Sequence, residues 1–167
     1  MTAMMSHLQC FFLHVDHGVE DARNTDVSRY LSAVASATNC PIHRISLQWI
    51  DNAALSTLID DLKRSVLGSK RTALLICGSH LEDQVTVCSL EALLEGFDVH
   101  LLCDIISARD VKLKPVLLLR LFQAGAVPSS LRQFLYMWQA AETDQRMSEN
   151  LRKLLENYDS EFATRTR

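Results

Sequence analysis

Two polar positions that could do chemistry stand directly behind apolar runs of the chain. Asp16 closes the run 10–15, "CFFLHV", and the turn 78–84, "GSHLEDQ", follows the run 71–77, "RTALLIC". A carboxylate behind an apolar strand is partly desolvated and can act as a general base. An aspartate in this place can equally cap the loop that follows. The residues alone leave both interpretations open.

The second position contains no obvious nucleophile. Gln84 ends the turn, and an amide side chain can orient or hydrogen-bond a ligand but does not attack a carbonyl. Cys88 follows four residues later, one turn along the same face of a predicted helix, where we expect it to be a buried core thiol. The chain has five cysteines, an odd number, and their spacing matches no zinc site. Free thiols in a reducing compartment are therefore expected.

Apolar runs and helical periodicities alternate along the whole chain. This alternation with short connections predicts an α/β fold, a three-layer α-β-α arrangement with a mostly parallel sheet of about five or six strands. We expect one domain over 1–167, whose last 20 or so residues form a helix and a frayed tail. The expected strands are 10–15, 40–47, 71–77, 97–103 and a short one at 126–127, and the expected helices are 26–38, 51–68, 82–96, 113–125, 129–141 and 144–158.

Ligands of an open parallel sheet bind beyond the carboxyl ends of its strands. This rule selects Asp16 with His17 after the first strand, and Ser79 with His80 after the third. We therefore predict His17, Ser79 and His80 as ligand-binding residues. An exposed turn histidine without a ligand remains the simpler interpretation of His80.

The stretch "RTALLICGSHLEDQVTVCSLEALLEGFDVHLLCDIISAR…LLLRLFQAGAVPSS" carries a more specific signal. It is similar to the core of the isochorismatase-like cysteine hydrolases, which include nicotinamidases, N-carbamoyl amidohydrolases and the eukaryotic isochorismatase-domain proteins. The resemblance is closest to the last group and covers roughly residues 9–140. Its markers are Gly78, the pair Glu91–Ala92, Gly96, Asp104 and "FQAGAV". It implies a Rossmann-type topology.

The resemblance also implies a catalytic set of a cysteine nucleophile, an aspartate base and a lysine. Asp16 matches the aspartate, Gln84 occupies the cysteine position, and Arg44 in "IHRIS" is the candidate for the lysine. The metal-binding Asp-x-His segment of nicotinamidases has no counterpart, so we expect neither a metal nor a cofactor. Loss of a nucleophile removes nearly all the rate of a covalent mechanism.

Two hypotheses follow, and whether the chain is an enzyme stays open between them. The first is a catalytically degenerate member of this fold, a pseudoenzyme, that acts by binding a small ligand or a protein. The second is an active hydrolase of small amide, carbamoyl or related substrates. It would use Asp16 with a rearranged nucleophile, which is either Cys88 or water.

The composition and net charge indicate which classes of binding partner to expect. The net charge of −3, with 48% hydrophobic and 22% charged residues, gives no reason to expect nucleic acid or membrane partners. The first residues lack a secretory signal, so we expect a cytoplasmic protein. The resemblance implies a homo-oligomer, a dimer or tetramer. The apolar "FLYMW" stretch, 134–138, fits an interface, and a core contact within the chain explains it equally well.

Overall fold

The computed structural model describes residues 7–16, 22–46, 52–67 and 72–161. Five parallel strands form one sheet in the order β2-β1-β3-β4-β5. They are β1 (Cys10–Asp16), β2 (Ile42–Ser46), β3 (Ala73–Gly78), β4 (Asp98–Ile106) and β5 (Val127–Ser129). The helices are α1 (Ala22–Thr38), α2 (Asn52–Val66), α3 (Thr86–Leu94), α4 (Lys114–Gln123), α5 (Leu131–Ala141) and α6 (Gln145–Glu161), with a 3-10 turn at His7–Gln9 and a π-helical turn at Leu81–Val85.

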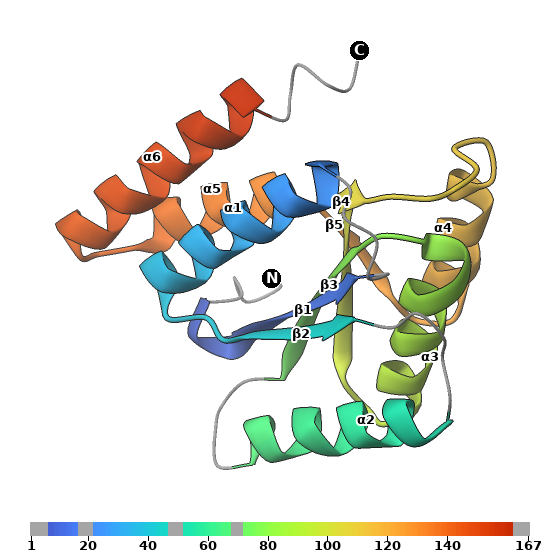
Figure 1. Cartoon of the computed structure of the whole chain (residues 1–167). Helices are drawn as coiled ribbons and strands as arrows, with labels where there is room; N and C mark the ends of the chain where they lie inside the picture. Colours follow the sequence, from blue (N-terminus) through green and yellow to red (C-terminus); the bar gives the residue numbers. More distant parts are fainter. Residues whose placement is uncertain (1–6, 17–21, 47–51, 68–71, 162–167) are drawn as a thin grey trace.

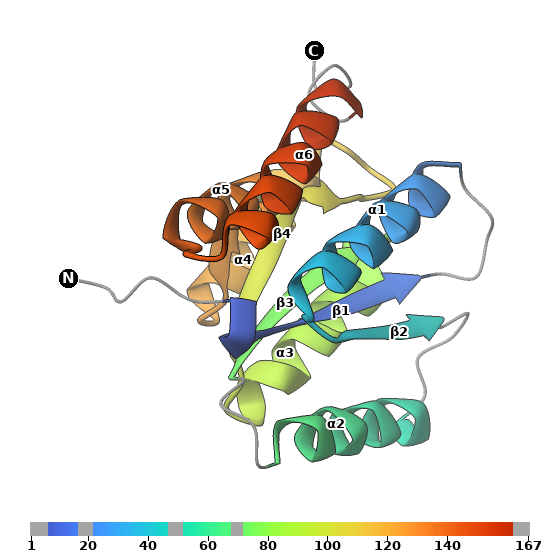
Figure 2. The ribbon, with the colours of Figure 1, turned by 90° about the vertical axis from the view of Figure 1, so that its left-hand side faces the viewer.

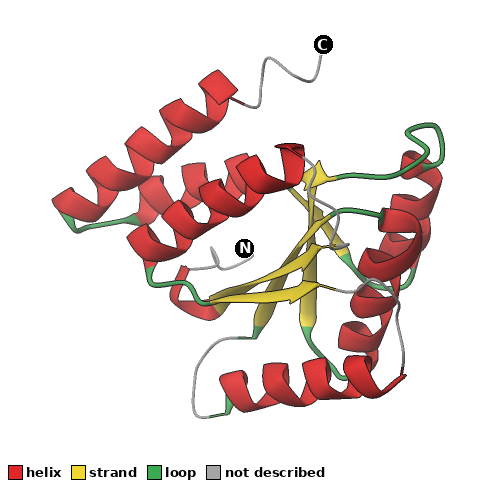
Figure 3. Cartoon of the chain, in the orientation of Figure 1, coloured by secondary structure: helices red, strands yellow, loops and turns green. Residues whose placement is uncertain are grey.

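The helices cover both faces of the sheet (Figure 3). Helices α1, α5 and α6 lie on one face, and α2, α3 and α4 lie on the other (Figures 1 and 2). Successive strand residues point to opposite faces. Accordingly Phe12 packs into the core under α1, α5 and α6, whereas Phe11 and Leu13 pack into the core under α2, α3 and α4. The three-layer α/β fold that the sequence predicts is confirmed.

Strand burial follows position in the sheet. All six residues of β3, the central strand, are buried, which explains its uninterrupted apolar sequence. The edge strands β2 and β5 are only partly buried. No helix within the described part of the chain is long and apolar enough to cross a membrane.

The last helix packs on its own chain. Leu151 and Tyr158 of α6 are buried in the core that they share with α1 and α5. The hydroxyl of Tyr30 in α1 donates a hydrogen bond to the Leu154 carbonyl of α6. The described part of the C-terminal segment therefore needs no neighbouring molecule to cover its apolar side.

The apolar stretch of α5 is likewise mostly internal. Phe134, Leu135 and Trp138 are at most 3% exposed, whereas Tyr136 is 58% exposed. An intrachain core contact therefore accounts for most of the "FLYMW" segment.

The structure differs from the sequence-based prediction around the third crossover. The predicted helix 82–96 is divided into the π-helical turn Leu81–Val85 and α3. Strand β4 also continues to Ile106, three residues beyond its predicted end. The backbone explains both differences, because Leu81 N–H donates to the Ser107 carbonyl at 3.0 Å and Ser107 N–H donates to the Gly78 carbonyl at 2.9 Å. These bonds tie the turn to the extended end of β4.

Candidate functional site

Strands β1 and β3 meet closely where the candidate site begins. Val15 and Gly78 are paired in the ladder, and Ser79 N–H donates to the Val15 carbonyl at 3.1 Å. Gly78 has φ +138°, and a Cβ atom added there would lie 1.9 Å from the Val15 carbonyl oxygen. Only glycine fits this conformation and this contact. The pairing places Ser79 beside the end of β1, where Asp16 is partly buried.

The turn after β3 has an unusual backbone. His80 lies in the left-handed region with φ 60° and ψ 64°, and it is followed directly by the π-helical turn. Left-handed residues other than glycine cost free energy, and π-helical turns often occur at functional sites. The His80 ring also lies 3.5 Å from the Arg109 guanidinium, measured from Nδ1 to Nη2.

Gln84 lies within this π-helical turn and is 3% exposed. Its neighbours Leu81 and Val85 belong to the core under α2, α3 and α4. The residue that the sequence analysis matched to the nucleophile position is therefore a buried neutral amide. An amide has no acidic proton to lose and offers no electron pair for attack on a carbonyl, but it can donate and accept hydrogen bonds.

The nearby thiol is not activated. Cys88 is 1% exposed, and burial raises the pKa of its thiol to about 12. Burial also raises the pKa of Cys77 and of Cys103. Reactive cysteines need a lowered pKa and access to solvent. Cys88 has neither property.

The loop between β4 and α4 contacts the π-helical turn and stabilises it. Arg109 pairs with Asp83 at 2.9 Å, and Asp110 N–H donates to Glu82 Oε1 at 2.9 Å. Burial opposes the charge of the Glu82 carboxylate. Hydrogen bonds from backbone N–H groups, with the nearby Arg109, outweigh this effect and lower its pKa below the ordinary value. Glu82 is therefore an anion that holds the loop.

Lys114 contributes a cation that the sequence interpretation missed. Its Nζ donates to the carbonyls of Cys103 at 2.9 Å and Ile106 at 2.6 Å, so it is anchored to the end of β4. A lysine at the first position of α4 faces the positive end of the helix dipole, which disfavours it. This unfavourable place was the one sequence signal that Lys114 has specific partners.

The Arg44 side chain contacts α1. From β2 its Nη2 donates to Ser32 Oγ at 2.6 Å, and Nε and Nη2 lie 3.4 and 3.5 Å from Ser28 Oγ and O. The guanidinium is thus bound along α1. Arg44 therefore forms a structural contact between β2 and α1. His17 lies outside the described residues.

Buried polar atoms that could bind a ligand are present at the turn. Ser79 Oγ and Glu82 Oε2 are buried and find no hydrogen-bond partner among the described residues. Buried polar atoms are normally satisfied, so each invites a ligand group or a water molecule. No group of three or more His, Cys, Asp or Glu side chains in the described segments is arranged to hold a metal ion.

Solved structures of other proteins share this fold. YcaC from Pseudomonas aeruginosa, solved with hexane-2,5-diol and covalent acrylamide, matches with TM-score 0.69 over 98% of this chain and 96% of that chain. YcaC from Escherichia coli, an octameric hydrolase of unknown specificity, matches with TM-score 0.61 over 96% and 98%. The chain has the fold of the YcaC hydrolases. The fold implied by the isochorismatase-like resemblance is therefore confirmed.

The same fold occurs in a protein of another activity. The MAR1 ribonuclease from Caenorhabditis elegans matches with TM-score 0.72 over 92% of this chain and 93% of that chain. All three neighbours are 16% identical to this chain, which supports a shared fold and nothing about the reaction. No protein-family model and no curated protein matches the sequence.

Proposed function

We propose that this chain is a catalytically degenerate protein of the isochorismatase-like hydrolase fold. Its function is to bind a small polar ligand at the carboxyl ends of β1 and β3. The observation that carries the proposal is Gln84, a buried amide at the start of the helix where the hydrolase mechanism needs a thiolate. The high pKa of the Cys88 thiol supports it further, since no neighbouring cysteine replaces the missing nucleophile.

The polar groups of the turn indicate the chemistry of the ligand. Ser79 can donate or accept one hydrogen bond, and Glu82 can accept one on Oε2. Asp16 adds a carboxylate, and His80 and Arg109 border the turn. A small amide or carbamoyl compound offers N–H donors to the carboxylates and a carbonyl acceptor to the hydroxyl. His17 remains a predicted contact from the sequence.

Hydrolysis by an activated water is the second candidate function. Asp16 supports it, because a partly buried carboxylate at the end of β1 can accept a proton from water. The ribonuclease among the structural neighbours makes RNA a substrate worth including in a test.

We also propose that the chain forms a homo-oligomer in the cytoplasm. The octameric state of the Escherichia coli neighbour supports self-association. All five cysteines are free thiols, which is the usual state in a reducing compartment.

The test is a titration of ¹⁵N-labelled protein with acetamide, nicotinamide, N-carbamoylglycine and a single-stranded oligoribonucleotide. We expect one of the amide or carbamoyl compounds to shift the backbone signals of Ser79 and His80, while the spectrum of the compound itself stays unchanged over hours. Ser79→Ala should weaken this binding about tenfold, the effect of one lost hydrogen bond. Ser56→Ala, on exposed α2, is the matched control and should bind like the unmodified chain.

Two results would contradict the proposal. Formation of hydrolysis products that Asp16→Asn abolishes would establish the second candidate function instead. Shifts confined to residues away from the turn would show that the ligand site lies elsewhere.

A further inference from the structure

Strands β4 and β5 bring a serine, a histidine and an aspartate together at one edge of the sheet (Figure 1). His100 of β4 lies between the other two residues. Its Nδ1 is 3.1 Å from Ser129 Oγ, and its Nε2 is 3.4 Å from Asp98 Oδ1. A hydroxyl within hydrogen-bond reach of a base, with a third group facing that base, is the arrangement of an activated nucleophile.

The charge of Asp98 favours one tautomer of His100. A carboxylate beside Nε2 favours the tautomer that carries its proton on Nε2, and this tautomer leaves an electron pair on Nδ1. Nδ1 then accepts the hydrogen bond that the Ser129 hydroxyl donates. The His100 side chain is only 11% exposed, so water competes little for either nitrogen. The Ser129 proton is therefore directed at the base.

Asp98 also stabilises the charged form of the imidazole. Nε2 is buried and has no hydrogen-bond partner among the described residues, since 3.4 Å to Asp98 is longer than a normal hydrogen bond. When His100 takes the serine proton, the positive ring attracts the carboxylate and the contact becomes an ion pair. This attraction is stronger while the ring is charged than in the resting state, and interactions of this kind accelerate a reaction.

Ser129 lies where a reagent can reach it. Strand β5 is an edge strand, and Ser129 is partly exposed at its carboxyl end, directly before Ser130, the N-cap of α5. By analogy, the nucleophile of α/β-hydrolases also lies between the end of a strand and the start of a helix. Phe134 of α5 packs edge-on against the His100 ring, with 5.6 Å between the ring centroids, and so fixes the orientation of the ring.

The start of α5 limits which substrates can react. The N–H groups of Leu131 and Arg132 already bind the Asp104 carboxylate, so they do not stabilise an oxyanion. The rate gain is therefore that of general-base catalysis alone, about 100-fold. Acyl or phosphonyl donors with a good leaving group, such as aryl esters and fluorophosphonates, react under these conditions, whereas amides do not.

We propose that Ser129 is a nucleophile that His100 and Asp98 activate toward aryl esters. Ser129 Oγ bonds to the ester carbonyl carbon, and its proton passes to His100 Nδ1. The bond from that carbon to the aryl oxygen breaks, and the aryloxide takes the proton from His100. Water then hydrolyses the acyl group by the same steps and restores the hydroxyl. This activity is independent of the proposed ligand site, because it uses other strands and another class of compound.

Labelling with a fluorophosphonate tests the nucleophile. In this reaction Ser129 Oγ bonds to phosphorus, fluoride leaves, and the serine proton passes to His100. Peptide mass spectrometry of the folded, unmodified chain should locate the phosphonate on Ser129, and p-nitrophenyl acetate should acetylate the same hydroxyl. Concentrated urea should abolish this selectivity, because the hydroxyl and the imidazole then separate. Ser129→Ala should prevent both modifications.

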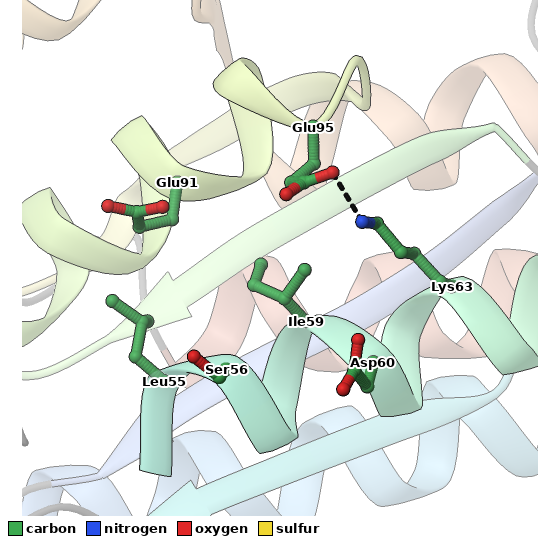
Figure 4. A pocket seen from close by; sticks show the side chains of 7 residues that line it. All are labelled: Leu55, Ser56, Ile59, Asp60, Lys63, Glu91 and Glu95. Atoms are coloured by element: carbon green, nitrogen blue, oxygen red, sulfur yellow. Dashed lines mark ion pairs between the residues drawn. The ribbon is translucent and has the colours of Figure 1, made fainter. Parts of the chain in front are cut away.

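Ser56→Ala is the matched control and should be labelled like the unmodified chain. Ser56 is exposed on α2 beside the groove between α2 and α3, and none of the described residues that line this groove is a histidine (Figure 4). Asp98→Asn removes a charge from a side chain that is 50% exposed and keeps its shape. This variant should be labelled about fivefold more slowly, with an unchanged circular dichroism spectrum.

Three results would count against the proposal. Labelling of no serine, or of Ser56 as rapidly as Ser129, would show that the contact between His100 and Ser129 only joins two strands, and would overturn the proposal. An unchanged labelling rate in Asp98→Asn would overturn the role of Asp98. Phosphonylation of Ser129 without acetylation by p-nitrophenyl acetate would overturn aryl esters as the substrate class.

Discussion

Gly78 determines how closely β1 and β3 approach each other at the candidate site. We expect Gly78→Ala to lower the free energy of unfolding by about 3 kcal/mol, because the new methyl group would overlap the Val15 carbonyl and the backbone would be strained. Urea denaturation measures the loss. Gly96→Ala is the control, since Gly96 has φ +83° with no atom within 4 Å of an added Cβ. It should cost about 1 kcal/mol, from backbone strain alone. Equal losses would show that the close contact is unimportant.

Individual side chains were harder to place from the sequence than the strands that carry them. The sequence placed Asp16 and Ser79 at the ends of β1 and β3, because an apolar run that ends in a polar residue marks the end of a strand. It did not show that Arg44 binds the hydroxyl groups of α1 or that Lys114 reaches the carbonyls of β4. Those contacts join elements that are distant in sequence, so no local pattern encodes them.

At the scale of elements, the Asp104 carboxylate connects β4, α5 and α6. Asp104 of β4 accepts hydrogen bonds from Leu131 N–H at 3.0 Å and Arg132 N–H at 3.3 Å, at the start of α5. The hydroxyl of Tyr158 in α6 donates to the same carboxylate at 2.6 Å. The anion both satisfies the first N–H groups of α5 and anchors α6. This explains why Asp104 lies in the latter part of a buried strand.

We expect Tyr158→Phe to lower the free energy of unfolding by about 1.5–3 kcal/mol, the contribution of a hydrogen bond to a charged acceptor. The ring stays in place, so the measurement isolates the hydroxyl. Tyr136→Phe, at a side chain of α5 that is 58% exposed, should leave stability unchanged. Guanidinium denaturation compares the two variants. A Tyr158→Phe variant as stable as the unmodified chain would mean that Asp104 holds α5 alone.

The connection between β3 and β4 is where the elements predicted from the sequence differ from those in the structure. Helical periodicity indicated a single helix after β3, and the structure has a π-helical turn before α3. The tie from Leu81 N–H to the Ser107 carbonyl depends on the extended end of β4, which the sequence placed three residues too early. Periodicity reports which side of an element is apolar, and it carries no information about backbone bonds to a neighbouring strand.

At the scale of the whole molecule, the alternation of strands and helices along the chain, with short connections between them, was enough to predict the fold class. Parallel strands joined by crossover helices leave few arrangements, and the observed sheet with helices on both faces is the expected one. Function is set separately, by individual side chains, and we propose that those at the carboxyl edge of the sheet set it here. The proposed loss of the nucleophile at Gln84 is therefore compatible with an intact hydrolase fold.

Reaction with acrylamide tests the absence of a nucleophile most directly. The Pseudomonas aeruginosa YcaC was solved with covalent acrylamide and serves as the positive control. At pH 8, a thiol of pKa about 12 is ionised in only about one molecule in ten thousand, so Cys88 of the folded chain should react far more slowly than it does after denaturation. Mass spectrometry locates the adduct. Slow labelling of all five cysteines is the predicted result, and rapid, stoichiometric modification of Cys88 in the folded protein would contradict it.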